Sequence, residues 1–388
     1  MAAARARARA MAAAALLGPA VAAAVPLLLI GCAIAMPAAE AQVVVMGAYN
    51  ETCPQAEDVV FKEMTAIVAE KPHLAGAVLR LFSLDCFVDG CEGSILLDST
   101  AGNTAEKDAP LNRGVRGYEV VDAIKAKLDA ACPGVVSCAD ALALAARDSI
   151  RLTKGPFIPL PTGRRDGYRS VADDVALFSP APDATITDII NLFAIRFNLT
   201  AKDVAVLSGA HTIGQARCST VSPRLYDFAG HKGASDPALD GNYTATLRGQ
   251  CKPGDNATLV DLDLDPTTPA IFDADYYALV AGKRGLLSTD AALLQYPATR
   301  DYVERQASAA SPDEFFADFA ESFVAMSRLD VLTHHKGEIR KVCSKVNPPS
   351  DSPPVVVPSP SSSADARSYQ LAAATGGLAL ALAVALVL

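Results

Sequence analysis

Residues 79–91 read LRLFSLDCFVDGC, and residues 207–214 read LSGAHTIG. The first stretch places a cation, Arg80, before two closely spaced cysteines, Cys86 and Cys91, and has an apolar residue, Leu84, four positions after the arginine. The second places His211 before a Thr-Ile-Gly sequence. A lone histidine is more often structural than a metal ligand. The rest of the chain must therefore show whether the two stretches belong to the same fold and the same functional site.

Both ends of the 388-residue chain resemble processing signals. Residues 1–41 contain Arg5, Arg7 and Arg9, then a long apolar run and small residues before Gln42, a pattern typical of a cleaved signal peptide. A retained membrane anchor is the alternative, since the apolar run is long. The mature body is expected over residues 42–348, in a protein secreted to the extracellular space.

The C-terminal end carries a second signal. Residues 349–364 form a Pro/Ser-rich linker. Residues 365–388 end in an apolar tail that matches a GPI-type signal, which would tether the protein to the outer face of the plasma membrane. The alternative is a membrane span, because an apolar run of this length can just cross a bilayer.

Composition narrows the function class. The net charge of −9 argues against a nucleic-acid partner, which requires a basic surface. Four glycosylation sequons, at Asn50, Asn198, Asn242 and Asn256, fit a secreted glycoprotein.

Helical periodicity recurs over residues 120–130, 138–150, 186–197, 202–207, 273–281 and 312–326, whereas strand signals are sparse. The body is therefore predicted to be all-α, and Thr200 with Asp203 is predicted to cap a helix start.

The cysteines indicate an oxidising compartment. The chain has nine, and Cys32 lies in the expected signal peptide, which leaves eight in the body. An even number in an exported chain predicts a disulfide framework, although eight cysteines allow 105 pairings. A zinc site is disfavoured, because no histidine is near the closely spaced pairs in sequence.

Further motifs occur at residues 132–148, 161–167 and 337–343. With the two opening stretches, they resemble the secretory (class III) plant haem peroxidases over residues 49–347. The resemblance implies a monomeric, two-lobed, all-α fold with one haem b between a distal and a proximal helix. It also implies an oxidoreductase that consumes hydrogen peroxide, oxidises small phenolic donors and serves in the response to oxidative stress. The implied disulfides are Cys53–Cys132, Cys86–Cys91, Cys138–Cys343 and Cys218–Cys251.

The resemblance also implies site residues. His211 corresponds to the haem axial ligand and Asp290 to the carboxylate that orients it. Arg80 and Asn112 correspond to distal catalytic residues, and Pro161 to a residue that gates donor access. Two calcium sites are implied. The distal one is formed by Asp85, Val88, Gly90, Glu92 and Ser94, with Glu92 where aspartate is usual, and the proximal one by Thr212, Asp265, Thr268, Ile271 and Asp273. The remaining histidines, His73, His231, His334 and His335, match no ligand and are predicted to be surface groups.

The chain departs from this family at the distal histidine, whose place Leu84 takes. General acid–base assistance is typically worth about 10²–10⁴-fold in rate, so we expect peroxide turnover to be slow. Ser83 replaces an aromatic residue and should widen the distal pocket. One alternative function is a non-enzymatic haem- and calcium-binding protein of the cell surface. Another is chemistry on bulky hydroperoxides or of an oxygenase type, which the wider pocket would admit.

Overall fold

The computed structural model describes residues 43–181, 184–262 and 270–349. The described residues up to Val346 belong to one compact unit, and residues 347–388 are assigned to a second. The fold below is that of the first. The expected signal peptide, Cys32, nearly all of the linker and the C-terminal tail lie outside the described residues. In the part of the chain that is described, no helix combines the length and apolar content that crossing a membrane requires.

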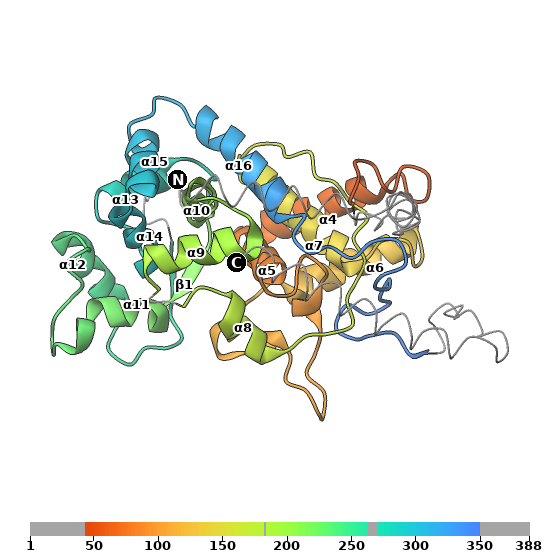
Figure 1. Ribbon diagram of the computed structural model, residues 1–388, viewed down its shortest axis with the longest axis horizontal. Coiled ribbons are helices and arrows are strands. Elements are labelled where there is room, and N and C mark those ends of the chain that lie inside the picture. The colour runs from red at the N-terminus through yellow and green to blue at the C-terminus, as the bar shows by residue number, and fades with distance from the viewer. Residues whose placement is uncertain (1–42, 182–183, 263–269, 350–388) are drawn as a thin grey trace, which may run out of the picture. The chain divides into compact units, whose positions relative to one another are not determined.

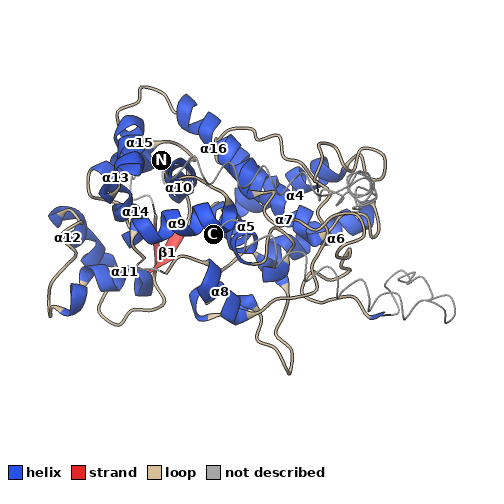
Figure 2. Ribbon diagram, in the orientation of Figure 1, coloured by secondary structure: helices blue, strands red, loops and turns tan. Residues whose placement is uncertain are grey.

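The described chain is mostly helical, as predicted, and Figure 2 shows helices joined by long loops. The α-helices are α4 (Ala56–Glu70), α5 (Leu74–Val88), α6 (Tyr118–Ala131), α7 (Cys138–Leu152), α8 (Ala172–Phe178), α9 (Ile186–Phe197), α10 (Ala201–Ser208), α11 (Cys218–Leu225), α12 (Gly241–Gln250), α13 (Asp275–Ala281), α14 (Ser288–Ala292), α15 (Pro297–Ala307) and α16 (Asp313–Met326). The 3₁₀ turns are η2 (Ser94–Leu96), η3 (Glu106–Asp108), η4 (Pro110–Asn112), η5 (Gly209–Thr212), η6 (Phe228–Gly230) and η7 (Leu293–Gln295). Two short strands, β1 (Gln215–Arg217) and β2 (Leu259–Asp261), pair antiparallel, with Ala216 opposite Val260.

Local sequence explains where the helices α9 and α10 begin. Thr200 accepts a hydrogen bond from the backbone N–H of Asp203, whose carboxylate in turn binds the Thr200 backbone, so the predicted cap of α10 is confirmed. Thr185 and Asp188 form the same reciprocal cap on α9. Each cap satisfies donors that the first helical turn leaves without partners. The short loop between the helices contains Asn198, which adopts a left-handed conformation and ends α9.

The hydrophobic core is organised around α7. Nearly every residue of this helix is buried, including the small residues Ala141, Ala143 and Ala145, and it packs against α4, α5 and α6. A helix buried on all sides forms the centre of a domain. Figure 1 shows α4, α6 and α7 together in one part of the unit and α11 to α15 in another. The main core contains residues from both parts, and a smaller apolar cluster joins α11, α12 and the strand pair. The helix α5 is thereby held against the central helix.

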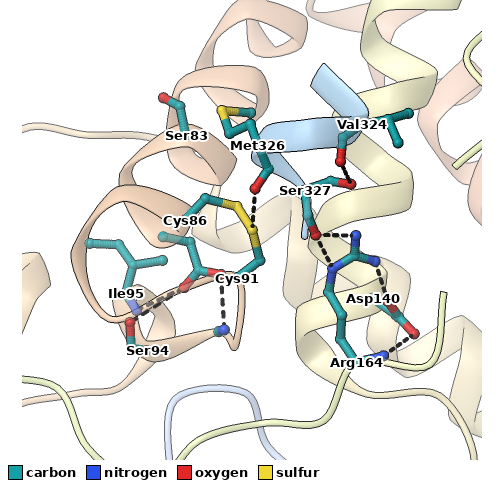
Figure 3. The surroundings of a disulfide bond; sticks show 12 residues. Ser83, Cys86, Cys91, Ser94, Ile95, Asp140, Arg164, Val324, Met326 and Ser327 are labelled. Atoms are coloured by element: carbon teal, nitrogen blue, oxygen red, sulfur yellow. Dashed lines mark hydrogen bonds and ion pairs between the residues drawn. A yellow bond between two sulfur atoms is a disulfide. The ribbon is translucent and has the colours of Figure 1, made fainter. Parts of the chain in front are cut away.

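Four disulfides connect the expected cysteine pairs, Cys53–Cys132, Cys86–Cys91, Cys138–Cys343 and Cys218–Cys251. Figure 3 shows the surroundings of the second pair, which joins Cys86 in the last turn of α5 to Cys91 just after the helix. Cys91 Sγ lies 3.1 Å from the carbonyl oxygen of Met326, the last residue of α16. The next carbonyl, of Ser327, accepts hydrogen bonds from Arg164. The end of α16 therefore contacts both the disulfide loop and the buried arginine.

Candidate active site

The predicted proximal residues, His211 and Asp290, are in contact. His211 lies on η5, directly after α10, and Asp290 lies on α14. His211 Nδ1 and Asp290 Oδ1 are 2.8 Å apart. Because an ionised carboxylate can only accept hydrogen bonds, the shared proton belongs to Nδ1, which leaves the lone pair on Nε2. Asp290 is 1 % exposed, whereas 32 % of the His211 side chain remains exposed. This arrangement fits a histidine that binds iron through Nε2.

The backbone around Asp290 fixes the position of its carboxylate. Asp290 Oδ2 accepts a hydrogen bond of 2.8 Å from the backbone N–H of Leu287. Gly285 lies so close that a Cβ atom on it would be 2.8 Å from Asp290 Cβ. A residue larger than glycine at position 285 would therefore displace the carboxylate from His211.

Of the predicted distal residues, Arg80, Ser83 and Leu84 lie on α5, and Asn112 lies on η4. Arg80 is exposed, and Ser83 and Leu84 are half-buried. Partial desolvation lowers the pKa of the Arg80 guanidinium; Tyr118 opposes this shift, and the nearby charges of Arg116 and Arg217 add to it. The Ser83 hydroxyl donates a hydrogen bond of 2.8 Å to the Arg80 carbonyl oxygen. Arg80 thus supplies a positive charge at this surface, and Leu84 has no atom that can take up a proton.

Asn112 carries a polar atom that lacks a partner. Its Nδ2 donates to the Glu106 carbonyl oxygen at 2.9 Å. Its Oδ1 is buried and has no hydrogen-bond partner among the described residues. Buried side-chain acceptors are rarely left without a donor. The N–H of an imidazole at position 84 would be a hydrogen-bond donor of the right chemical type. The Leu84 side chain has no hydrogen-bond donor.

Glu106, which precedes Asn112 on this segment, is also buried. Its Oε1 accepts a hydrogen bond of 3.2 Å from the hydroxyl of Ser170. Burial raises the pKa of Glu106 to about 9, and the charge of Asp85 contributes to the shift. The carboxyl group is therefore protonated at neutral pH.

The predicted distal calcium residues form a buried acidic loop. Asp85 accepts hydrogen bonds from the backbone N–H groups of Gly93 at 2.9 Å and Ile95 at 3.3 Å, and from the Ser94 hydroxyl at 3.5 Å. The carbonyl oxygen of Gly90, another predicted ligand, accepts from the backbone N–H of Glu92 at 2.7 Å. Oxygen atoms gathered in this way are the ligands that calcium prefers.

Glu92 fits into this loop because Gly167 has no side chain. The Glu92 carboxylate occupies the space that a Cβ atom on Gly167 would fill. Burial raises the pKa of Asp85 to about 7 and that of Glu92 to about 8, and the charge of Asp85 adds to the shift of Glu92. A cation would favour the ionised form of both carboxyls. In the described residues, no group of three or more His, Cys, Asp or Glu side chains forms a ready metal site.

Part of the predicted proximal calcium site is also assembled. The Thr212 hydroxyl donates to Asp273 Oδ1 at 2.9 Å and lies 3.4 Å from the Ile271 carbonyl oxygen. Asp265 and Thr268 fall outside the described residues. Because Thr212 directly follows His211, a cation held here would fix the backbone beside the histidine.

Known proteins match the chain over most of its length. A family model described as Peroxidase matches residues 60–309. The chain belongs to the peroxidase family. This peroxidase is 48 % identical to "Peroxidase 1" of Oryza sativa subsp. japonica over 302 residues, which cover 77 % of this chain and 91 % of that protein. It is 45 % identical to "Peroxidase 3" of Arabidopsis thaliana over 304 residues, 78 % of this chain and 91 % of that protein. "Peroxidase 27" of Arabidopsis thaliana is 45 % identical over 309 residues, 80 % of this chain and 94 % of that protein.

The family assignment confirms that the chain is a class III haem peroxidase, an oxidoreductase with a mostly helical fold. Members of this plant family bind haem and calcium. Here His211 and Asp290 have the chemistry that a haem site needs. The acidic loop of Asp85 and Glu92 has the chemistry that a calcium site needs.

Two further predictions concern Pro161 and the remaining histidines. Pro161 is buried in this peroxidase, and its carbonyl oxygen accepts a hydrogen bond of 2.9 Å from Arg164. Its role as the donor gate stays a prediction. The four remaining histidines, His73, His231, His334 and His335, are exposed, as predicted. His73 precedes the first residue of α5 and is not part of that helix.

One residue near the site has no counterpart in the sequence predictions. Tyr276 donates its hydroxyl to Asp290 Oδ1 at 3.0 Å, the same oxygen that His211 contacts. In the sequence, Tyr276 and Tyr277 form an aromatic pair in an apolar segment, which predicts core packing. The hydroxyl of a buried tyrosine usually has a hydrogen-bond partner. A tyrosine in an apolar segment is therefore the only feature of the sequence that points to a buried polar group near Tyr276.

Proposed function

We propose that this peroxidase is a secreted glycoprotein that binds one haem b through His211 and uses hydrogen peroxide to oxidise small phenolic donors slowly. The contact between His211 Nδ1 and Asp290 Oδ1 is the observation that carries the proposal. Bound haem supplies an iron that stores the oxidising equivalents of peroxide until donor molecules consume them. The protein's own side chains orient the iron ligand, stabilise charge and determine how protons move.

On the proximal side, Asp290 holds the proton on His211 Nδ1. A hydrogen-bonded carboxylate fixes the ring orientation and makes Nε2 a better electron donor. The buried position of Asp290 keeps water from competing for this hydrogen bond. The pair therefore orients the ligand and tunes the iron.

On the distal side, Arg80 can stabilise negative charge that develops on the leaving oxygen of peroxide. Leu84 cannot accept the peroxide proton or return it, so that proton must travel through solvent. Loss of general acid–base assistance of about 10²–10⁴-fold raises the barrier by roughly 3 to 5 kcal/mol. The unpartnered Oδ1 of Asn112 supports the proposal that the distal network lacks one member. The reaction is slowed but not abolished.

Two calcium ions complete the proposed holoprotein. Asp85, Glu92, Ser94 and the carbonyls of Val88 and Gly90 hold the distal ion, and the Thr212 segment holds the proximal one. Glu92 reaches further than aspartate, and the absence of a side chain at Gly167 leaves room for its longer arm.

The cellular setting is also part of the proposal. The signal peptide directs the protein out of the cell, and a lipid anchor that replaces the C-terminal tail holds it at the membrane surface. The asparagines of the four sequons, Asn50, Asn198, Asn242 and Asn256, are all exposed, which supports glycosylation. The donors reach the site past Pro161, and the protein acts as a monomer.

The test is to load the purified protein with haem and compare it with a His211→Ala variant. We expect a Soret band typical of a histidine ligand in the parent protein and its loss in the variant. Peroxide-dependent oxidation of a phenol should be slow in the parent protein but faster than in the variant. A parent protein without a Soret band contradicts the proposal.

A second candidate function is a non-enzymatic haem- and calcium-binding protein of the cell surface. Leu84 favours it, because haem binding by His211 does not depend on a distal base. Haem-loaded protein that oxidises phenol no faster than the His211→Ala variant would support this function over the first.

A further inference from the structure

Asp290 Oδ1 accepts hydrogen bonds from two side chains. His211 Nδ1 approaches it at 2.8 Å and the Tyr276 hydroxyl at 3.0 Å. The two rings meet edge to face, with centroids 6.0 Å apart and an interplanar angle of 80°. Tyr276 is 3 % exposed and Asp290 1 % exposed. The carboxylate that accepts both hydrogen bonds is therefore shielded from water, although part of the His211 ring is exposed.

The two donors compete for the negative charge of one oxygen. A hydrogen bond to the charged form of a carboxylate stabilises it and lowers its basicity. The Tyr276 hydroxyl therefore weakens the pull of Asp290 on the proton of His211 Nδ1. A weaker pull gives the imidazole less anionic character, so it donates less electron density through Nε2. Asp290 thus increases the electron density that His211 donates through Nε2, and the Tyr276 hydroxyl reduces it.

Tyr277, the next residue of α13, shows that this contact is specific. Its side chain is 0 % exposed, and its hydroxyl donates to the carbonyl oxygens of Ala205 at 3.1 Å and Val206 at 3.4 Å. Its hydroxyl therefore binds the backbone of α10 and not Asp290. Two adjacent, buried tyrosines thus have different partners, and of the two only Tyr276 binds the carboxylate beside His211.

We propose that Tyr276 is a positioning residue that sets the strength of the His211–Asp290 hydrogen bond and, through it, the reduction potential of the bound haem. The second part rests on the proposed function, in which His211 binds the iron. The first part concerns the protein alone and does not require haem.

The experiment compares Tyr276→Phe with Tyr277→Phe as the matched control, since each variant removes one buried hydroxyl from α13. In the full-length protein without haem, proton NMR follows the His211 Nδ1–H resonance. We expect this resonance to move downfield in Tyr276→Phe, because Asp290 then has one donor fewer, and to stay in place in Tyr277→Phe. An unmoved resonance in Tyr276→Phe, or equal shifts in the two variants, overturns the proposal.

The haem-loaded protein gives a second readout. We expect Tyr276→Phe to favour ferric over ferrous haem by about tenfold, a fall in potential of about 59 mV for a one-electron couple, and to raise the iron–histidine stretching frequency. Tyr277→Phe should leave both unchanged. The two readouts are separable. If the NMR resonance shifts but the haem shows no histidine ligand, the proposed function is contradicted, whereas the effect of Tyr276 on Asp290 is supported.

Fluorotyrosine at position 276 covers the case in which the phenylalanine variant does not fold. The fluorinated hydroxyl is a stronger donor, so the Nδ1–H resonance should move upfield and the potential should rise. A shift in the same direction as that expected for Tyr276→Phe would show that packing, and not hydrogen bonding, is responsible.

Discussion

Gly76 and Gly214 lie backbone against backbone. A Cβ atom on Gly76 would be 2.5 Å from Gly214 Cα and 2.8 Å from its nitrogen. Gly214 adopts a φ of 102°, which glycine tolerates and other residues rarely do. Gly76 belongs to α5, which carries Arg80 and Leu84, and Gly214 follows closely after His211. The contact therefore sets how closely the distal helix approaches the histidine segment.

Gly76→Ala should separate the distal helix from the His211 segment. The added methyl group would overlap backbone that has no room to move, and overpacking of this kind costs about 1–3 kcal/mol. We expect a loss of that size in the free energy of unfolding, measured by denaturant titration, together with faster loss of haem. Gly249→Ala is the control, because nothing lies within 4 Å of a Cβ atom at that helical position. Equal stability of the two variants would contradict the argument.

Leu84→His should restore a distal base. We expect peroxide to be consumed at least about a hundredfold faster, at the lower end of the usual gain from general acid–base catalysis. Stopped-flow spectroscopy of the haem-loaded variant measures the rate. Leu84→Gln is the matched control, since its side chain is polar but cannot act as a base, and it should give no comparable gain. Equal rates in the parent protein and Leu84→His would show that another group already acts as the base.

Asn112 should contribute to that gain. Its Oδ1 is buried and unpartnered in the described structure, and the family resemblance assigns Asn112 to the segment that supports the distal histidine by hydrogen bonding. We expect the rate of Leu84→His with Asn112→Ala to fall below that of Leu84→His alone. In the Leu84 background, Asn112→Ala should change the rate little. The difference between the two backgrounds, measured as a double-mutant cycle, isolates the coupling. No difference would remove Asn112 from the distal network.

Calcium should stabilise the protein more at high pH. Without a cation, burial raises the pKa of Asp85 from 3.8 to about 7 and that of Glu92 from 4.5 to about 8. The folded state then binds protons more tightly than the unfolded state, so stability falls as pH rises through this interval. Calcium favours the ionised carboxylates and offsets the loss. We expect the rise in Tm on adding calcium to stripped protein to be larger at pH 8.5 than at pH 5.5.

Glu92→Gln tests the source of this pH dependence. The amide does not ionise, so the stability of the stripped variant should fall less steeply with pH. Its gain in Tm on adding calcium should be smaller than that of the parent protein at pH 8.5. Matching pH profiles in the parent protein and the variant would assign the effect to other groups.

Much of the fold could be predicted from helical periodicity. The segment 186–197 coincides with α9, and the predictions for α7, α10 and α16 end within two residues of the observed bounds. The predictions missed α15, because its buried face includes Thr299 and Gln306 beside Tyr302 and Val303 and so lacks a clear apolar stripe. The helix α4 was also missed, although Ala56, Val60 and Met64 are buried at a spacing of four.

Site residues could be predicted from the sequence only where they belong to a motif shared with the family. His211 and Asp290 lie 79 positions apart, and no periodicity links them; the family resemblance made the pairing predictable. The close approach of Gly76 to Gly214 and the hydroxyl of Tyr276 depend on how distant segments pack. Glycine and tyrosine occur in many settings, so residue type alone does not reveal such contacts.

The buried ion pair of Arg164 and Asp140 should be essential to stability. Both side chains are 0 % exposed, and Arg164 Nη1 lies 2.7 Å from Asp140 Oδ1. Asp140 Oδ2 accepts from the Tyr49 hydroxyl at 2.6 Å, and Arg164 Nη2 donates to the Ser327 carbonyl oxygen at 2.6 Å (Figure 3). Removing one partner leaves the other charge buried and uncompensated, which costs about 3–5 kcal/mol.

We therefore expect Arg164→Met to lower the free energy of unfolding by about 3–5 kcal/mol, measured by denaturant titration. The matched control is Arg305→Met, because Arg305 and Glu314 form a pair whose side chains are 50 % and 48 % exposed. Exposed pairs contribute less than about 1 kcal/mol. If Arg164→Met cost no more than Arg305→Met, the end of α16 would be held by the apolar core and the disulfide loop without help from the arginine.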